Sequence, residues 1–292
     1  MKVRMESGRL DREVKHWDDV ANAELEGELS LLRVGADDLC DKTKAWLPLI
    51  DIPVLTEALI AKLGDLRGRR ILDLGTGNGF LATALALRGA RVTAVDLSPV
   101  SLKVARQRAA MSGVEDRIEF ALMPAEKMDF PDASFDAACG IFVLHHTDLD
   151  ASGREIGRLL KPGAPAAFIE TMAFNPLLMA ARRHVSGRFG VEKASSDDEA
   201  PIGSAGLERL RASFPGTVNV EWPAVVFARM LGYLPFFRSS FLWMLLKGTD
   251  KALAAMPSLE RMSYFGMIVM RSTEAYGGGH VGSIKDKPLS DT

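Results

Sequence analysis

Cysteine is scarce in this chain of 292 residues, which contains only Cys40 and Cys139. The two do not form a C-x-x-C pair, so the sequence offers neither a zinc motif nor a disulfide framework. The first residues also contain no apolar core of signal-peptide length. We therefore expect a cytoplasmic protein without a metal site.

An excess of charge of one sign is missing as well. Lysine and arginine number 36, aspartate and glutamate 38, and the formal net charge is −2. Nucleic-acid binders usually carry a basic excess, so we expect no nucleic-acid partner. The apolar fraction of 47% and the charged fraction of 25% are those of an ordinary globular protein.

A long uninterrupted apolar run is the third absence. The best candidate, residues 223–246, is broken by Arg229 and Arg238 and by two prolines, Pro223 and Pro235. A charge near the centre of a bilayer is costly. We expect two short amphipathic helices broken near Pro235 and no integral membrane span. Peripheral contact with a membrane stays compatible with this pattern.

What the sequence does contain is a regular alternation of strand and helix patterns. Short apolar runs predict strands, and segments with helical spacing and capping residues predict helices between them. This alternation predicts a Rossmann-like, doubly wound, mostly parallel sheet covered on both faces. The expected strands lie within 69–74, 91–97, 116–122, 134–146, 164–171, 217–222 and 264–272, and the expected helices of the core within 80–89, 98–113 and 151–163.

The remaining segments suggest a cap around this core. We expect residues 1–68 to form an N-terminal helical part of the cap, and 69–272 to form the core, with helical lid insertions at about 173–216 and 223–263. The glycine-rich tail 273–292 is expected to be disordered. The apolar side chains of the lid favour core packing over a substrate pocket, although a cap of this kind also fits an apolar or aromatic ligand. They are Met230, Tyr233, Phe236, Phe237, Phe241, Trp243 and Met244. Arg182, Arg183 and His184 favour a solvated face over an anion site.

The glycines of "LDLGTGNGF" follow the first expected strand, at Gly75, Gly77 and Gly79. The dinucleotide fingerprint places its third glycine one residue later. Asp73 precedes the glycines, where a carboxylate is awkward beside a pyrophosphate but useful beside an ammonium group. Asp96 ends the second expected strand, where ribose hydroxyls are bound in such sheets. The pattern favours a nucleoside that carries an amino acid over a dinucleotide or a purely structural turn.

Four segments together carry a resemblance to a known family: "ILDLGTGNG", "VTAVDLS", "FPDASFDAACGIFVLHH" and "IGRLLKPGAPAAFIE". In order and spacing they resemble class I S-adenosylmethionine-dependent methyltransferases, especially the small-molecule group that includes the ubiquinone and menaquinone methyltransferases. The resemblance implies a seven-stranded sheet with an antiparallel last strand over 264–272. It also implies S-adenosylmethionine as the cofactor.

The resemblance also implies which residues bind that cofactor. The backbone at the glycines, with Asp73, would hold the methionine part, Asp96 the ribose, and Leu97 would lie against the adenine. Many relatives have an aspartate near the adenine where this chain has Pro124, so the Ala125 amide or Glu126 would have to substitute. The full candidate set is Asp73, Gly75, Thr76, Gly77, Asn78, Gly79, Asp96, Leu97, Ala125, Glu126 and Gly140.

Three residues are candidates for acid–base chemistry. His145 and His146 follow the fourth expected strand, and Glu170 ends the fifth. A metal site would need more ligands at usable spacing. A general base is chemically sensible, because an unperturbed imidazole titrates near neutral pH. For the histidines the alternative is a pocket-lining or structural role. For Glu170 the alternative is a hydrogen bond to the backbone of a loop. His146 is the preferred base.

Taken together, these observations predict methyl transfer from S-adenosylmethionine to a small apolar or aromatic acceptor, with oxygen slightly favoured as the acceptor atom. The alternatives are C- or N-methylation of a quinone or lipid-like acceptor, a nicotinamide-dependent oxidoreductase on the same fold, and a non-catalytic ligand sensor. A monomer or a homodimer fits the sequence equally.

Overall fold

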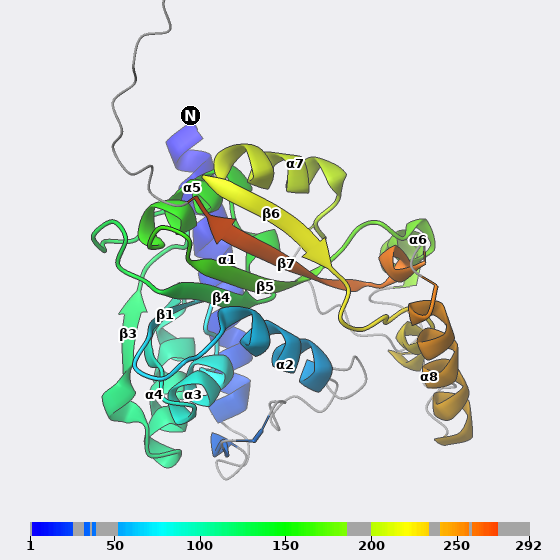
Figure 1. Cartoon of the computed structure of the whole chain (residues 1–292), viewed down its shortest axis with the longest axis horizontal. Helices are drawn as coiled ribbons and strands as arrows, with labels where there is room; N and C mark the ends of the chain where they lie inside the picture. The colour runs from blue at the N-terminus through cyan, green and yellow to red at the C-terminus, as the bar shows by residue number, and fades with distance from the viewer. Residues whose placement is uncertain are drawn as a thin grey trace, which may run out of the picture.

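A single mixed sheet of seven strands forms the centre of the computed structural model, which describes residues 2–25, 32–35, 37–38, 52–185, 200–233, 240–256 and 259–273. The strand order is β3-β2-β1-β4-β5-β7-β6, and β7 runs in the direction opposite to the other six strands (Figure 1). The expected Rossmann-like sheet with a reversed last strand is confirmed. The bounds are β1 Arg70–Leu74, β2 Arg91–Asp96, β3 Ile118–Leu122, β4 Ala137–Ile141, β5 Pro165–Thr171, β6 Gly216–Glu221 and β7 Phe265–Ser272.

Helices cover both faces of this sheet, because the central strands are apolar on both sides. One face carries α2 (Ile52–Leu63), α3 (Phe80–Leu87) and α4 (Pro99–Met111), and the other carries α5 (Leu149–Leu159) and α7 (Ser204–Ser213) (Figure 1). Each face has its own large apolar cluster. Because the strands other than β7 are parallel, their carboxyl ends lie at the same edge of the sheet. This carboxyl edge holds the candidate site.

The helices beside the first two strands begin and end where local chemistry requires. Ser98 caps α4, since its hydroxyl accepts a hydrogen bond from Ser101 N, and Pro99 occupies the first helical turn. Gly89 adopts a φ of 95° directly after α3, a conformation that glycine adopts at little cost. These ends agree with the expected helices.

Three helices lie outside the two covering layers. The long helix α1 (Lys2–Leu25) packs along α4. Helix α6 (Pro176–Val185) follows β5, and α8 (Ser240–Ala254) lies at the right of Figure 1, away from the sheet. Four short 3-10 helices complete the described elements: η3 Glu115–Arg117, η4 Leu144–His146, η5 Ala228–Tyr233 and η7 Glu260–Met262.

The side chains of the expected lid differ in their exposure. Phe241 and Met244 are 68% and 61% exposed, so the expectation that they pack in the core is wrong. Met230 packs against the apolar cluster on the α2 face. Trp243 is half-buried. Phe236, Phe237, Pro235 and the side chain of Tyr233 lie outside the described residues, as do residues 186–199 and 274–292.

The basic end of α6 is partly solvated, as expected. Arg183 and His184 are exposed, whereas Arg182 is half-buried and donates a hydrogen bond of 2.6 Å to the hydroxyl of Tyr264. Within the described parts of the chain, no helix combines the length and the apolarity needed to cross a bilayer.

Candidate functional site

The turn between β1 and α3 brings three left-handed glycines to the carboxyl end of the sheet. A Cβ at Gly75 would lie 2.6 Å from Val143 Cγ2, and one at Gly79 would lie 2.6 Å from Ala105 Cβ. Close packing therefore requires these two glycines. Gly77, with a φ of 53°, is different, because a Cβ there would meet no atom within 4 Å. Gly77 thus faces open space.

Asp96 holds this turn from the end of β2. Its Oδ2 accepts a hydrogen bond of 2.8 Å from Gly77 N, and its Oδ1 accepts one of 2.9 Å from Ser98 N. The Asp96 side chain is half-buried. An ionised carboxylate only accepts hydrogen bonds, so it suits a donor such as a ribose hydroxyl.

Asp73, near the end of β1, is a buried carboxylate with 1% of its surface exposed. Burial raises its pKa to about 7; the hydrogen bond of 2.7 Å from Thr76 Oγ1 opposes this shift, and the negative charge of Asp96 adds to it. A buried carboxylate with so high a pKa favours the arrival of a cation. The neighbouring thiol of Cys139 lies 3.9 Å away, and burial raises the pKa of this thiol too.

Asn78 completes the turn, and a fully buried arginine supports it. The carbonyl of Asn78 accepts a hydrogen bond of 2.9 Å from Arg108 Nε, which comes from α4. Arg108 also donates to the carbonyl of Leu32 at 3.3 Å. Sequence reasoning missed Arg108, although an arginine four residues after Val104 stands on the apolar stripe of its helix, which is an unusual position.

Glu170 and His145 form a buried pair where β5 meets the loop after β4. Oε1 of Glu170 accepts hydrogen bonds from Val143 N at 3.1 Å and Leu144 N at 2.7 Å. Its Oε2 lies 2.5 Å from His145 Nδ1, and both side chains are at most 2% exposed. The carboxylate therefore fixes the backbone of the 3-10 helix η4 and the ring of His145 together.

The residue before this loop, Phe142, has a φ of 58°. Such a conformation is costly for a bulky side chain and persists only where surrounding contacts impose it. Here Phe142 N donates a hydrogen bond of 2.8 Å to Ile169 O, and its ring packs 5.3 Å from that of Phe265. The strained residue turns the chain sharply at the end of β4, which directs the two histidines that follow.

His146 faces a different element, the N-terminal helix α1. Its Nδ1 lies 3.4 Å from Glu13 Oε2, within the range of an ion pair but longer than an ordinary hydrogen bond. Trp17 donates a hydrogen bond of 3.1 Å from Nε1 to the same Glu13 oxygen, and its ring meets that of His146 edge-on at 5.4 Å. The His145 and His146 rings lie 4.2 Å apart.

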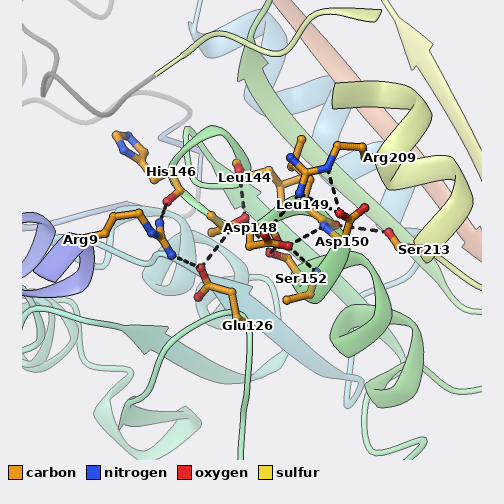
Figure 2. A network of polar contacts seen from close by, with 12 residues as sticks. Arg9, Glu126, Leu144, His146, Asp148, Leu149, Asp150, Ser152, Arg209 and Ser213 are labelled. Atoms are coloured by element: carbon orange, nitrogen blue, oxygen red, sulfur yellow. Dashed lines mark hydrogen bonds and ion pairs between the residues drawn. The ribbon is translucent and has the colours of Figure 1, made fainter. Parts of the chain in front are cut away.

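Arg9 joins the same helix to the candidate adenine side of the site. Figure 2 shows its guanidinium between the carbonyl oxygen of His146 and the carboxylate of Glu126, to which it donates at 2.6 Å. Glu126 also accepts a hydrogen bond of 3.1 Å from Asp148 N at the start of α5. Asp148 in turn pairs with Arg209 of α7. The carboxylate that was expected to substitute at the adenine is thus engaged within the chain.

The remaining candidate residues lie around the same edge of the sheet. Leu97 and Pro124 are half-buried, and Ala125 is 8% exposed. A Cβ at Gly140 would lie 2.7 Å from both Leu74 O and Val143 Cγ1, so packing between β1 and β4 is one reason for a glycine there. In the part of the chain that the structure describes, no cluster of His, Cys, Asp and Glu fits a metal ion.

The sequence placed residues 1–68 in a helical part of the cap, but it identified no residue of α1 as part of the site. Arg9, Glu13 and Trp17 recur every four residues, which places them on one stripe of the helix. That spacing of a cation, an anion and an aromatic ring was the available signal. It indicates a polar, contact-forming face, but it does not indicate what the face contacts.

Comparison with known proteins fits this geometry. Residues 72–168 match a family described as "Methyltransferase domain". This part of the chain is therefore similar to a methyltransferase domain. This domain comprises the glycine turn, β2 to β4 and most of β5, whereas α1 and the segments after β5 lie outside the match.

Curated relatives share the domain but not the whole chain. A ubiquinone biosynthesis O-methyltransferase of Alkalilimnicola ehrlichii is 40% identical over 132 residues, 44% of this chain and 52% of that protein. The methyltransferase GfsG of Streptomyces halstedii is 34% identical over 163 residues, 53% of this chain and 59% of that protein. The chain therefore spans about half the length of these relatives.

A solved structure extends the likeness of the fold beyond the matched residues. Geranyl diphosphate C-methyltransferase of Streptomyces coelicolor superposes with a TM-score of 0.57 at 14% identity, covering 91% of this chain and 98% of that one. At this identity the methyltransferase domain and its neighbour share a fold, and the fold alone does not decide the substrate.

Proposed function

We propose that this protein transfers a methyl group from S-adenosylmethionine to a small-molecule acceptor. The observation that carries the proposal is the turn at Gly77, whose amide is held by Asp96 while the position of a Cβ faces open space. A ligand can approach the backbone there, and only there among the three glycines of the turn. Asp73 adds a buried carboxyl group beside the same turn.

The residues present fit the donor. Asp96 is a carboxylate at the end of β2, a group that accepts hydrogen bonds from ribose hydroxyls, and Asp73 gains stability as a carboxylate when an ammonium group arrives. The geranyl diphosphate C-methyltransferase structure contains S-adenosyl-L-homocysteine, which supports this choice of donor. The matched domain and the named relatives support it as well.

The acceptor in this proposal is a small apolar or aromatic molecule that is methylated on oxygen. The name of the Alkalilimnicola relative includes O-methylation in ubiquinone biosynthesis, and this supports an aromatic hydroxyl. Methylation of a quinone or lipid-like acceptor on carbon or nitrogen is the second choice. In both cases we propose that α1 and the helical segments after β5 cap the acceptor, since α1 contacts the loop after β4 and α6 follows the end of β5.

S-adenosylmethionine supplies a methyl group that is already activated on a sulfonium, so transfer is an in-line displacement. The chain's own residues then have to align the acceptor, exclude water and take its proton. We assign the proton to His146, because the Nδ1 of His145 and both oxygens of Glu170 are engaged in holding the η4 backbone. His145 and Glu170 position the loop that carries His146.

The decisive experiment compares donor binding to the wild type and to Asp96→Ala by calorimetry. We expect the wild type to bind S-adenosylmethionine and S-adenosylhomocysteine but not NAD. We expect Asp96→Ala to weaken donor binding about 100-fold or more, since hydrogen bonds to a charged group contribute about 1.5–3 kcal/mol each. Asp116→Ala, which removes an exposed aspartate from η3, is the matched control and should bind like the wild type.

Two results would contradict this proposal. Unchanged donor binding by Asp96→Ala would remove the role assigned to the β2 carboxylate. Binding of NAD in place of S-adenosylmethionine would instead support the nicotinamide-dependent oxidoreductase, the alternative from another class that the fold permits.

A further inference from the structure

We propose that Glu13, a residue of α1 outside the matched methyltransferase domain, is the positioning residue for the base His146. The inference rests on the proposed function, because it assigns a partner to the residue that takes the acceptor's proton. It adds a second element to the catalytic machinery. The domain would supply the base, and the N-terminal helix would supply the carboxylate that orients it.

The first step is geometric. Glu13 Oε2 lies 3.4 Å from His146 Nδ1, close enough for electrostatic attraction but without a hydrogen bond between the two atoms, and the two side chains are 5% and 11% exposed. A carboxylate at this place favours a proton on Nδ1, which leaves Nε2 with its lone pair. That tautomer is the one in which Nε2 can accept a proton.

The second step concerns how Glu13 itself is held. Trp17, one helical turn further along α1, donates its indole N–H to the same Glu13 oxygen at 3.1 Å, and its ring lies edge-on to His146. The ring of His16 also packs edge-on against that of Trp17, with 5.0 Å between the ring centroids. A carboxylate that is buried and hydrogen-bonded in this way keeps a fixed direction.

The third step is the charge that forms during the reaction. The acceptor's O–H bond breaks, its proton forms an N–H bond at Nε2, and the oxygen electron pair forms the bond to the methyl carbon. The electron pair of the methyl–sulfur bond stays on the departing thioether. His146 then carries a positive charge, which the nearby Glu13 carboxylate stabilises.

His145 provides the internal contrast. The Nδ1 of His145 lies 2.5 Å from Glu170, and the His145 side chain is 2% exposed. The carboxylate of Glu170 also accepts hydrogen bonds from the backbone of Val143 and Leu144, so it holds this histidine and the loop together. The same pair of residue types thus occurs twice, 4.2 Å apart between the two rings. The His145–Glu170 pair holds the loop, and the His146–Glu13 pair, whose carboxylate comes from α1, remains for the proton transfer.

Two variants of Glu13 separate the effect of its oxygen atom from the effect of its negative charge. Glu13→Leu removes both, whereas Glu13→Gln removes the charge but keeps an oxygen beside His146 Nδ1 that can also accept the Trp17 N–H. Asp19→Leu, which removes an exposed acid from the same helix, is the matched control. Thermal melting and S-adenosylhomocysteine binding show whether each variant folds.

The first readout is the tautomer of His146, measured by 15N NMR on the full chain with labelled histidine. His146→Gln identifies its signals among those of the five histidines. We expect the neutral ring of the wild type and of Glu13→Gln to carry its proton on Nδ1, and that of Glu13→Leu to shift to Nε2. An Nε2-protonated ring in the wild type, or no change in Glu13→Leu, would overturn the proposal.

The second readout is turnover with methyl-labelled S-adenosylmethionine and a panel of simple phenols and catechols. We expect kcat to fall about 100-fold in Glu13→Leu and about 10-fold in Glu13→Gln, with KM and donor binding unchanged. Asp19→Leu should match the wild type. Equal kcat in all variants would overturn the positioning role. A wild type that methylates no compound of the panel would count against the proposed acceptor, while the tautomer measurement still decides the role of Glu13.

Discussion

Two regions build the candidate site, and they hold their residues by different means. In the sheet-edge region, Asp73 and Glu170 stand at the ends of β1 and β5, and Glu170 accepts hydrogen bonds from backbone amides. In the helix region, Arg9, Glu13 and Trp17 reach the loop after β4 through side chains. The backbone contacts of the sheet-edge region are part of the fold, whereas the side-chain contacts of the helix region are added to it.

The difference indicates how the two regions contribute. Loss of a sheet-edge contact leaves buried backbone groups without partners and is costly to folding. Loss of the Arg9–Glu126 contact in the helix region removes a partly exposed ion pair, and such a pair contributes little to stability. We expect the sheet-edge region to dominate stability and the helix region to act mainly on the geometry of the reaction.

Glu170→Ala is expected to have the largest effect on stability. It leaves Val143 N, Leu144 N and the His145 ring without their acceptor in a site that is 0% exposed at Glu170. We expect a loss of about 3–5 kcal/mol in the free energy of unfolding, the usual cost of removing one partner from a buried charged network. Urea denaturation followed by circular dichroism measures it.

Glu119→Ala is the matched control for this change. Glu119 is an exposed residue of β3, so its loss should alter the free energy of unfolding by no more than about 0.5 kcal/mol. If Glu170→Ala and Glu119→Ala were equally stable, the Glu170 carboxylate would not stabilise the sheet-edge region. That result would contradict the proposed difference in stability between the two regions.

Asp73 should make the sheet-edge region sensitive to pH. Its folded pKa of about 7 lies above the ordinary value of 3.8, chiefly because of burial, so the folded chain retains a proton that the unfolded chain releases. Stability therefore falls as pH rises between these values. Between pH 5 and pH 8 this effect costs on the order of 2 kcal/mol. In Asp73→Asn the free energy of unfolding should not show this part of the decrease between the two pH values, as urea denaturation at each pH would measure.

Donor binding gives a second measure of the same carboxylate. An ammonium group beside Asp73 favours the ionised form, so binding at pH 6 should release close to one proton in the wild type and none in Asp73→Asn. Calorimetry in two buffers of different ionisation enthalpy counts the protons. Equal proton release by both proteins would show that Asp73 does not face the ammonium group.

Much of the sheet-edge region could be predicted because short sequence patterns determine it. The alternation of strands and helices predicted the first five strands, separate short apolar patterns predicted β6 and β7, and Ser98, Pro99 and Gly89 predicted the ends of two helices. The glycine turn and Asp96 were predictable because a left-handed turn needs glycine, and an acid at the end of β2 necessarily lies beside it.

The rest depends on contacts between distant segments, which periodicity does not reveal. Glu170 was predicted to stand at the end of β5, but its bonds to Val143 and Leu144 arise only because Phe142 adopts a left-handed conformation that no local rule favours. Glu126 was a candidate for the adenine, yet its partner Arg9 lies 117 residues away. Helical spacing indicated a face on α1 without indicating its contacts.

Arg9→Ala is expected to have the smallest effect on stability, and it tests how the helix region is attached. The Arg9–Glu126 ion pair is partly exposed, at 27% and 16% for the two side chains, and such pairs contribute about 1 kcal/mol or less. We expect the free energy of unfolding to change by no more than this, while hydrogen exchange of the α1 amides quickens and that of the β4 and β5 amides does not. Lys15→Ala, an exposed cation on the same helix, should leave both unchanged. If Arg9→Ala instead quickened exchange in β4 and β5, α1 would belong to the cooperative core, and the helix region would not be an addition to the sheet.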